Sequence, residues 1–240
     1  MRAASLVLMN TEPARDAMRA LYPQYAERIL AVPNGVDDDP LPQPPSSEAE
    51  RARRFVIAYA GTVYLDRNPR NLFRAAARVA RELGLTPERF GIEFMGEKGP
   101  GWIEAMAAEE GIGPFVAVHP PGPRLAAAAF MTRASVLVNL PQDSHLAVPS
   151  KIFEYMRYEA AILALAAPES ATAALLRGTD ADVVDPEDVD GIAESLRRRI
   201  RQHGSGIRPR PLASLERFSR RAQADRLFDA LEALTSPPAR

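Results

Sequence analysis

The sequence predicts an α/β protein with a doubly wound parallel sheet, and three observations support this prediction. Short apolar runs alternate with segments of helical periodicity from residue 55 onward. The first run, residues 55–60, is apolar throughout, as expected for a strand buried on both faces of a parallel sheet. Turns that contain glycine or proline separate the segments. Six strands alternating with helices imply a Rossmann-like sheet with helices on both faces.

The elements of this sheet are expected from the spacing of apolar residues. Strands are predicted at residues 55–60, 92–95, 115–118, 135–140, 161–166 and 182–184. Helices are predicted at residues 69–83, 102–111, 125–131, 169–177 and 186–201, with a short one after residue 149. A polar break at 202–211 precedes a last helix, expected over about 212–234.

The chain divides into four predicted segments. Residues 1–36 read as strand, helix and strand, which we interpret as the remnant of an N-terminal domain because the piece is too small to stand alone. Residues 37–53 are rich in proline and serine, as in a linker, and begin with three aspartates that we interpret as solvated turn residues. Residues 54–211 form the expected Rossmann-like domain. Residues 212–240 form a C-terminal helix and tail.

Composition narrows the class of protein. The 240 residues carry a formal net charge of −1, which gives no electrostatic case for nucleic-acid binding. The absence of cysteine excludes disulfides and cysteine-based metal sites. No apolar stretch approaches the roughly 20 residues of a membrane-spanning helix. We therefore expect a cytoplasmic protein whose membrane contact, if any, is peripheral.

Residues 148–166, VPSKIFEYMRYEAAILALA, hold the densest cluster of unusual polar choices. Ser150 is expected to cap a short helix through its hydroxyl. Three apolar residues are then predicted to face the core: Ile152, Phe153 and Met156. Three polar residues fall on the opposite face: Lys151, Glu154 and Tyr158.

Lys151 lies in the first helical turn, where the helix dipole disfavours a positive charge by ~0.3–1 kcal/mol. Only two of the 30 basic residues are lysines, Lys98 and Lys151, and both lie where a loop leads into a helix. Backbone N–H groups at a helix start bind phosphate, and a lysine adds a point charge, so a diphosphate is the natural ligand. The alternative interpretation is a solvated surface lysine.

Four loops follow predicted strand ends, at Gly61–Arg67, Gly96–Gly101, His119–Arg124 and Gln142–Glu154. Ligands of doubly wound sheets lie beyond the carboxyl ends of the strands, so these loops predict one shared site. Within it, Glu154 is either a surface acid favoured by the helix dipole or an acceptor for the hydroxyls of a ribose.

Residues 148–166 resemble the signature of the retaining, nucleotide-sugar-dependent glycosyltransferases of family 4, whose GT-B fold has two Rossmann-like domains. In that family an apolar-flanked Glu-x-Met/Leu segment, a small polar turn and an Ile-Leu-Ala strand lie in the C-terminal, donor-binding domain. Residues 33–37, PNGVD, resemble the segment that closes the N-terminal domain. The resemblance implies the tail of a first domain followed by a complete second domain.

The resemblance also implies residues for the donor site. Gly61 matches the glycine after the first strand of the donor domain, and Arg67 falls at the position of a lysine that holds the donor diphosphate. Thr62 stands where a further diphosphate-binding arginine is expected. Gly96 opens the loop after the next strand, and the segment that begins at His119 is implied to meet the nucleotide base. Arg67 also reads as an exposed loop arginine, and His119 as a hydrogen-bonded loop histidine.

One further position departs from the family pattern. Leu146 stands where many members carry a second glutamate that points at the transferred sugar. Gln142, Asp143 and His145 are the nearby residues that we consider as substitutes.

The resemblance implies the donor-binding half of a transferase that moves a hexose from a nucleotide diphosphate sugar to a sugar or lipid-linked acceptor with retention. Arg67, Lys151 and the amides of Ser150–Ile152 would stabilise the leaving diphosphate, and Glu154 would hold the ribose. No metal or other cofactor is expected beside the donor substrate. The alternative is a non-catalytic nucleotide-sugar-binding or assembly domain that needs a partner chain to supply the acceptor half.

Overall fold

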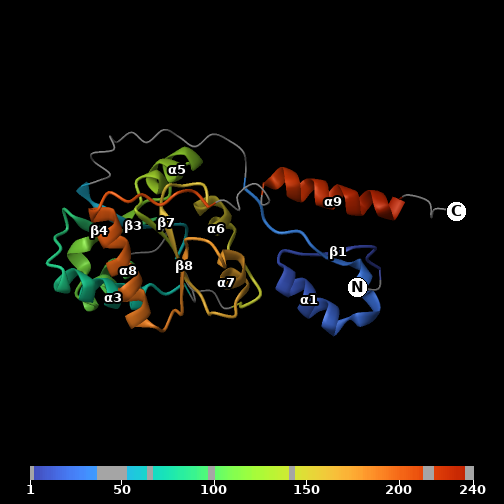
Figure 1. Cartoon of the computed structure of the whole chain (residues 1–240), viewed down its shortest axis with the longest axis horizontal. Helices are drawn as coiled ribbons and strands as arrows, with labels where there is room; N and C mark the ends of the chain where they lie inside the picture. Colours follow the sequence, from blue (N-terminus) through green and yellow to red (C-terminus); the bar gives the residue numbers. More distant parts are fainter. Residues whose placement is uncertain are drawn as a thin grey trace.

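The computed structural model describes residues 3–36, 53–63, 67–96, 101–140, 144–212 and 219–235. Its centre is a six-stranded sheet in which every neighbouring pair of strands is parallel. The strands are β3 (Phe55–Ala60), β4 (Phe90–Met95), β5 (Val116–His119), β6 (Val136–Asn139), β7 (Ala161–Leu165) and β8 (Asp182–Val184). Their spatial order is β5-β4-β3-β6-β7-β8, which confirms the predicted doubly wound sheet (Figure 1).

Six helices connect or follow these strands: α3 (Arg70–Glu82), α4 (Trp102–Glu109), α5 (Arg124–Thr132), α6 (Ser150–Tyr155), α7 (Ala171–Leu176) and α8 (Val189–Gly204). One apolar core lies between the sheet and α3, α4 and α8, and a second lies between the opposite face and α5, α6 and α7. The chain starts in the middle of the sheet at β3, builds outward to β5, and returns to the other side at β6. The strand order therefore reverses between β3 and β6, where sheets of this kind bind ligands.

Strand β3 shows why the sequence folds this way. Ile57 and Tyr59 face the core that α3, α4 and α8 cover, whereas Ala58 faces the other core. Successive side chains of a strand point to opposite faces, so a central strand must be apolar at every position. Burial of each large apolar side chain contributes ~1.5–3 kcal/mol.

The N-terminal segment forms a small separate sheet. Strands β1 (Val7–Met9) and β2 (Ile29–Ala31) pair in parallel and are joined by α1 (Glu12–Leu21) and the 3₁₀ helix η1 (Pro23–Arg28). Thr11 caps α1, because its hydroxyl accepts a hydrogen bond of 3.1 Å from the N–H of Ala14. The strand-helix-strand order predicted for residues 1–36 is present.

The C-terminal helix α9 (Arg220–Thr235) lies beside the N-terminal segment and not on the six-stranded sheet (Figure 1). Val36 and Ser219 form an isolated parallel bridge, and the N–H of Arg220 donates to the carbonyl of Val36 at 2.9 Å. The helix was expected to start near Leu212, but Leu212 is not helical and its N–H donates to the Met156 carbonyl at 3.1 Å. Except for Arg53, the predicted linker lies outside the described residues.

Within the described ranges, no helix combines the length and the apolar character needed to span a membrane. The same ranges contain no cluster of three or more His, Cys, Asp or Glu residues positioned for a metal ion.

Candidate functional site

The loops after β3, β4 and β5 meet backbone to backbone at the carboxyl edge of the sheet. The N–H of Gly61 donates to the Met95 carbonyl at 2.8 Å, and the N–H of Gly96 donates to the His119 carbonyl at 3.2 Å. Both glycines have positive φ, +135° and +117°. A Cβ on Gly96 would lie 3.0 Å from the carbonyl carbon of Gly61, so the contact needs glycine. The first residues of three of the four predicted loops therefore lie side by side, as the prediction requires of these strand ends.

Lys151 crosses this edge from one face of the sheet to the other. It lies on α6, which packs on the face of α5 and α7, but its Nζ is 3.7 Å from the ring centroid of Tyr59, whose side chain belongs to the opposite core. The side chain passes directly over Gly61, where a Cβ would lie 2.7 Å from Nζ. Gly61 therefore leaves the space that Lys151 occupies.

The ammonium of Lys151 is buried without a hydrogen-bond partner in the described part of the chain. Burial, together with the smaller effect of the positive charge of Arg67, lowers its pKa from 10.5 to about 7. Buried polar groups in folded proteins are normally hydrogen-bonded. An anion at this position would supply the missing partner and restore the charged form.

Arg67 and Thr62 join the same cluster. The carbonyl of Thr62 accepts hydrogen bonds from Arg67 Nη1 at 3.3 Å and from the Tyr59 hydroxyl at 3.2 Å. The Thr62 hydroxyl donates to the Gly96 carbonyl at 3.4 Å. Where the family resemblance leads one to expect an arginine, Thr62 ties the two glycine loops together instead.

The start of α6 differs from the prediction. The helix begins at Ser150 itself, and Pro149 occupies the N-cap position, so the expected Ser150 cap is wrong. Pro149 has φ −59° and ψ 131°, non-helical values of the kind that an N-cap residue adopts, and no side chain caps this helix. The N–H of Ile152 already donates to the Pro149 carbonyl at 3.1 Å, which occupies one of the amides assigned to the diphosphate.

Helix α6 is held against the end of β3 by Tyr155, whose buried hydroxyl accepts a hydrogen bond of 3.2 Å from the N–H of Ala60. The placement of Tyr158 on an exposed face is wrong. Tyr158 is 2% exposed, and burial raises its pKa to about 12. The polar face of α6 therefore reduces to Ser150 and Glu154, with Lys151 turned inward.

A cavity of about 580 Å³ lies beside this cluster, and the polar side of α6 lines part of it. Ser150, Lys151 and Glu154 line one wall, and the opposite wall comes from the N-terminal segment and α9. Its lining includes three arginines that the sequence reasoning did not single out: Arg124, Arg157 and Arg220. Among the described lining residues, Lys151 and these arginines outnumber Glu154, which favours an anionic ligand. Arg124 ends the predicted loop after β5, which is the signal that could have identified it.

The predicted residues thus form two groups that share Lys151. Gly61, Thr62, Arg67 and Gly96 cluster with Lys151 at the strand ends, and Ser150 and Glu154 line the cavity with it.

His119 lies apart from the described cavity lining. Its Nε2 is 3.2 Å from Glu93 Oε2, and its ring packs edge-on against Phe130 at 5.6 Å. Glu93 is itself buried and paired with Arg54 at 2.6 Å. His119 is the last residue of β5, and its side chain is held by these contacts, which agrees with the alternative interpretation of a hydrogen-bonded histidine.

Leu146, the position of the family's second glutamate, is 42% exposed, and its carbonyl accepts a hydrogen bond of 2.5 Å from the Thr11 hydroxyl. The side chain of His145 is exposed. Lys98, Gln142 and Asp143 lie outside the described residues, so their predicted roles stay predictions.

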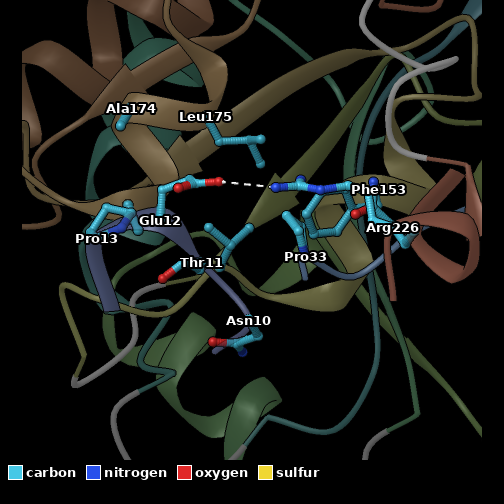
Figure 2. A pocket seen from close by; sticks show the side chains of 12 residues that line it. Asn10, Thr11, Glu12, Pro13, Pro33, Phe153, Ala174, Leu175 and Arg226 are labelled. Carbon is cyan, nitrogen blue, oxygen red and sulfur yellow. Dashed lines mark ion pairs between the residues drawn. The ribbon is translucent and has the colours of Figure 1, made fainter. Parts of the chain in front are cut away.

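A second cavity, of about 480 Å³, adjoins the first and shares Pro33 and Gln223 with it. Figure 2 shows Glu12 and Arg226 facing each other across it, with their closest charged atoms 3.6 Å apart. Phe153 and Leu175 supply apolar walls. The two cavities therefore lie side by side, and the N-terminal segment, α6, α7 and α9 contribute residues to their lining.

Comparisons with known proteins identify the class to which this fold belongs. The structure of Anabaena Alr3699/HepE in complex with UDP-glucose superposes with a TM-score of 0.69 at 14% identity, covering 96% of this chain and 64% of that one. A glycosyltransferase from Rickettsia africae superposes with a TM-score of 0.73 at 8% identity, covering 97% and 64%. The chain therefore has the fold of the GT-B glycosyltransferases, as the sequence resemblance implied.

A curated relative agrees with this fold. D-inositol 3-phosphate glycosyltransferase 1 of Catenulispora acidiphila is 34% identical over 152 residues, which cover 58% of this chain and 36% of the relative. No family model matches the sequence. The chain thus spans about a third of the curated relative and under two thirds of the structural neighbours described here.

Proposed function

We propose that this chain is the donor-binding half of a retaining glycosyltransferase. It transfers a hexose from a nucleotide diphosphate sugar to a sugar or lipid-linked acceptor. The curated relative and the GT-B fold support the reaction class, and the presence of UDP-glucose in the Alr3699/HepE structure supports the class of donor. The proposal includes a cytoplasmic location, with peripheral membrane contact if the acceptor is lipid-linked.

The observation that carries this proposal is the buried ammonium of Lys151 at the reversal of strand order, which has no hydrogen-bond partner among the described residues. In the proposed reaction the bond between the anomeric carbon and the diphosphate oxygen breaks, and that oxygen gains negative charge. Lys151 and Arg67 lie where they would stabilise it, and both are fixed before the donor arrives. Preorganised charge of this kind is usually the largest single contribution to catalysis.

The other proposed contacts follow from the cavity. Glu154 holds the ribose hydroxyls, Ser150 and the neighbouring amide of Lys151 face the phosphates, and Arg124 adds positive charge near the base. Gly61 and Gly96 allow the backbone to approach closely. The proposed chemistry uses the donor substrate and requires no further cofactor.

The test is ligand binding by the wild-type chain and by Lys151→Met. A nucleoside diphosphate at a hundred times its dissociation constant adds ~2.7 kcal/mol of stability. For a domain of this size the unfolding midpoint should then rise by roughly 5–10 °C. UDP, GDP, ADP and their sugar conjugates form the panel. We expect the unfolding midpoint to rise with the ligands of one base, and we expect this rise to be smaller in Lys151→Met.

Arg89→Met provides the matched control. Arg89 also carries one positive charge, but it is exposed and lies directly before β4, at the opposite edge of the sheet. Its removal should leave the ligand-induced shift unchanged. The absence of a shift with every member of the panel in the wild type would contradict a competent donor site.

The second candidate function is a binding or assembly domain that needs a partner chain. Large apolar side chains on α9 support it, because Phe228 is 60% exposed and Leu234 is 48% exposed. On the adjoining N-terminal segment, Leu21 is 72% exposed. Contiguous exposed apolar residues mark interaction surfaces. Transfer activity that appears only on mixing with a chain supplying an acceptor half would favour the enzyme, and binding without transfer in the mixture would favour the assembly domain.

A further inference from the structure

Tyr59 contacts Lys151 directly, and it also contacts the Thr62 carbonyl that binds Arg67. The proposed function gives Tyr59 no role. Its ring lies under the ammonium of Lys151, with Nζ 3.7 Å from the centroid. Its hydroxyl donates to the Thr62 carbonyl at 3.2 Å, and Arg67 Nη1 donates to the same carbonyl at 3.3 Å. One side chain therefore links Lys151 to the oxygen that orients Arg67.

The ring of Tyr59 is held firmly enough to act as a fixed support. Tyr59 is 1% exposed and pairs in register with Phe94 on β4, whose ring lies 5.9 Å away. Phe94 in turn packs edge-on against Phe73 of α3 at 5.9 Å. The ring is therefore continuous with the apolar core, and its rotation would require the core to repack.

The face of an aromatic ring attracts a cation, and the attraction is strongest where the cation is shielded from water. The Nζ of Lys151 is shielded in this way and has no hydrogen-bond partner among the described residues. Within the described part of the chain, the Tyr59 ring is thus the group that compensates the ammonium.

We propose that Tyr59 is a positioning residue for the diphosphate site. Its ring supports the ammonium of Lys151, and its hydroxyl fixes the Thr62 carbonyl that orients Arg67. Both cations are therefore in place before the donor binds. The inference rests on the proposed function and adds a residue that acts without touching the donor. Holding charged groups in their binding geometry in advance lowers the cost of association.

Two substitutions separate the ring from the hydroxyl. Tyr59→Phe keeps the ring under Lys151 and removes the hydrogen bond to Thr62, whereas Tyr59→Leu removes both. Affinities are measured for UDP, GDP and ADP and for the matching nucleosides. The ratio of diphosphate to nucleoside affinity isolates the contribution of the phosphates.

We expect Tyr59→Leu to lower this ratio by roughly 10-fold or more, from loss of the ring and the hydrogen bond together. Tyr59→Phe should lower it by only about 2- to 5-fold. Nucleoside affinity should stay unchanged in both. An unchanged ratio in Tyr59→Leu would overturn the proposal, and so would a parallel loss of nucleoside and diphosphate affinity, because that pattern reports a general disturbance of the fold.

A spectroscopic readout keeps the inference separate from the proposed function. Because the chain has two lysines, lysine labelled with ¹³C gives two sets of ε-methylene signals, and Lys98→Arg assigns them. A cation above a ring experiences the ring's magnetic shielding. The Lys151 signal should therefore lie upfield in the wild type and in Tyr59→Phe, and should return to its ordinary position in Tyr59→Leu. Equal chemical shifts of the Lys151 signal in the wild type and both variants would refute the contact between the ammonium and the Tyr59 ring, even if no nucleotide binds.

Discussion

Two buried cations in this chain have opposite surroundings. Arg199 of α8 is 5% exposed, with Nε 2.9 Å from Asp182 and Nη1 3.0 Å from Asp180. Burial alone lowers the pKa of Arg199, yet the hydrogen bonds that Arg199 donates to Asp182 and Asp180 bring the pKa above its ordinary value. Among the described residues no acid pairs with Lys151, and burial together with the charge of Arg67 lowers its pKa to about 7. A buried cation that the fold itself neutralises is structural, whereas one that the fold leaves without an anion indicates a ligand.

The largest expected effect comes from removing Arg199, the buried cation that Asp182 and Asp180 neutralise. Arg199→Met leaves the buried Asp182 with Arg198 as its remaining cation and with the Ser195 hydroxyl as a donor, and removal of one partner of a buried pair costs ~3–5 kcal/mol. For a chain of this size the unfolding midpoint should fall by roughly 6–20 °C. Lys151→Met, by contrast, removes a buried charge that no described acid neutralises and should raise stability by ~0.5–2 kcal/mol, as substitutions at binding sites commonly do. Thermal unfolding of the two variants measures the predicted loss of stability in Arg199→Met and the predicted gain in Lys151→Met. A loss of stability in Lys151→Met would break the comparison.

The next effect tests the passage of Lys151 over Gly61. Gly61→Ala places a Cβ 2.7 Å from Nζ at a φ of +135°, which non-glycine residues rarely adopt. We expect a cost of ~1–3 kcal/mol in stability. We also expect loss of nucleoside diphosphate binding, because Lys151 must leave its position. Gly84→Ala, at φ +59° with open space around the new Cβ, is the matched control and should leave binding intact. Equal binding by both variants would show that Lys151 does not need this path.

A smaller effect depends on pH. The folded chain releases the Lys151 proton near pH 7, whereas the unfolded chain keeps it to about pH 10.5. Between these values the unfolded state binds more protons, so the contribution of this group to stability rises with pH. The cost of the buried charge is fully present below pH 7. We expect the free energy of unfolding of the wild type, relative to Lys151→Met, to increase from pH 7 to pH 10. Denaturant unfolding at several pH values measures the difference, and a flat profile would contradict the burial of the ammonium.

The smallest effect compares two helix starts. Ser150 does not occupy the N-cap position of α6, so Ser150→Ala should change the free energy of unfolding by less than ~0.5 kcal/mol. Thr11 caps α1 with its hydroxyl, and Thr11→Ala should cost ~1 kcal/mol. Chemical denaturation of the two variants tests the assignment. A larger cost at Ser150 than at Thr11 would restore the cap that the sequence predicted.

The six-stranded fold was predictable because a parallel sheet buried on both faces needs continuous apolar runs. The run at residues 55–60 coincides with β3, and the run at 161–166 extends one residue beyond β7. The convergence of the glycine loops followed from the rule that parallel strands end at one edge. These features depend on local pattern and topology, which the sequence contains.

The details of the site were harder to predict from the sequence. The scarcity of lysine marked Lys151, but helical periodicity placed it on the solvent side, and only the three-dimensional path over Gly61 shows it above Tyr59. Arg220 reaches the cavity because α9 returns to the N-terminal segment, a contact between residues far apart in the chain. Periodicity within one segment carries no information about either contact.

The most direct test of the central claim is the titration of Lys151 itself. Selectively ¹³C-labelled lysine allows its ionisation to be followed by NMR, with and without the nucleoside diphosphate that binds most tightly among UDP, GDP and ADP. The account predicts a pKa near 7 in the free chain. It predicts an increase in that pKa on binding, because the phosphates favour the charged ammonium. A pKa near 10.5 in the free chain, or one that the bound nucleotide leaves unchanged, would contradict the assignment of Lys151 to the diphosphate.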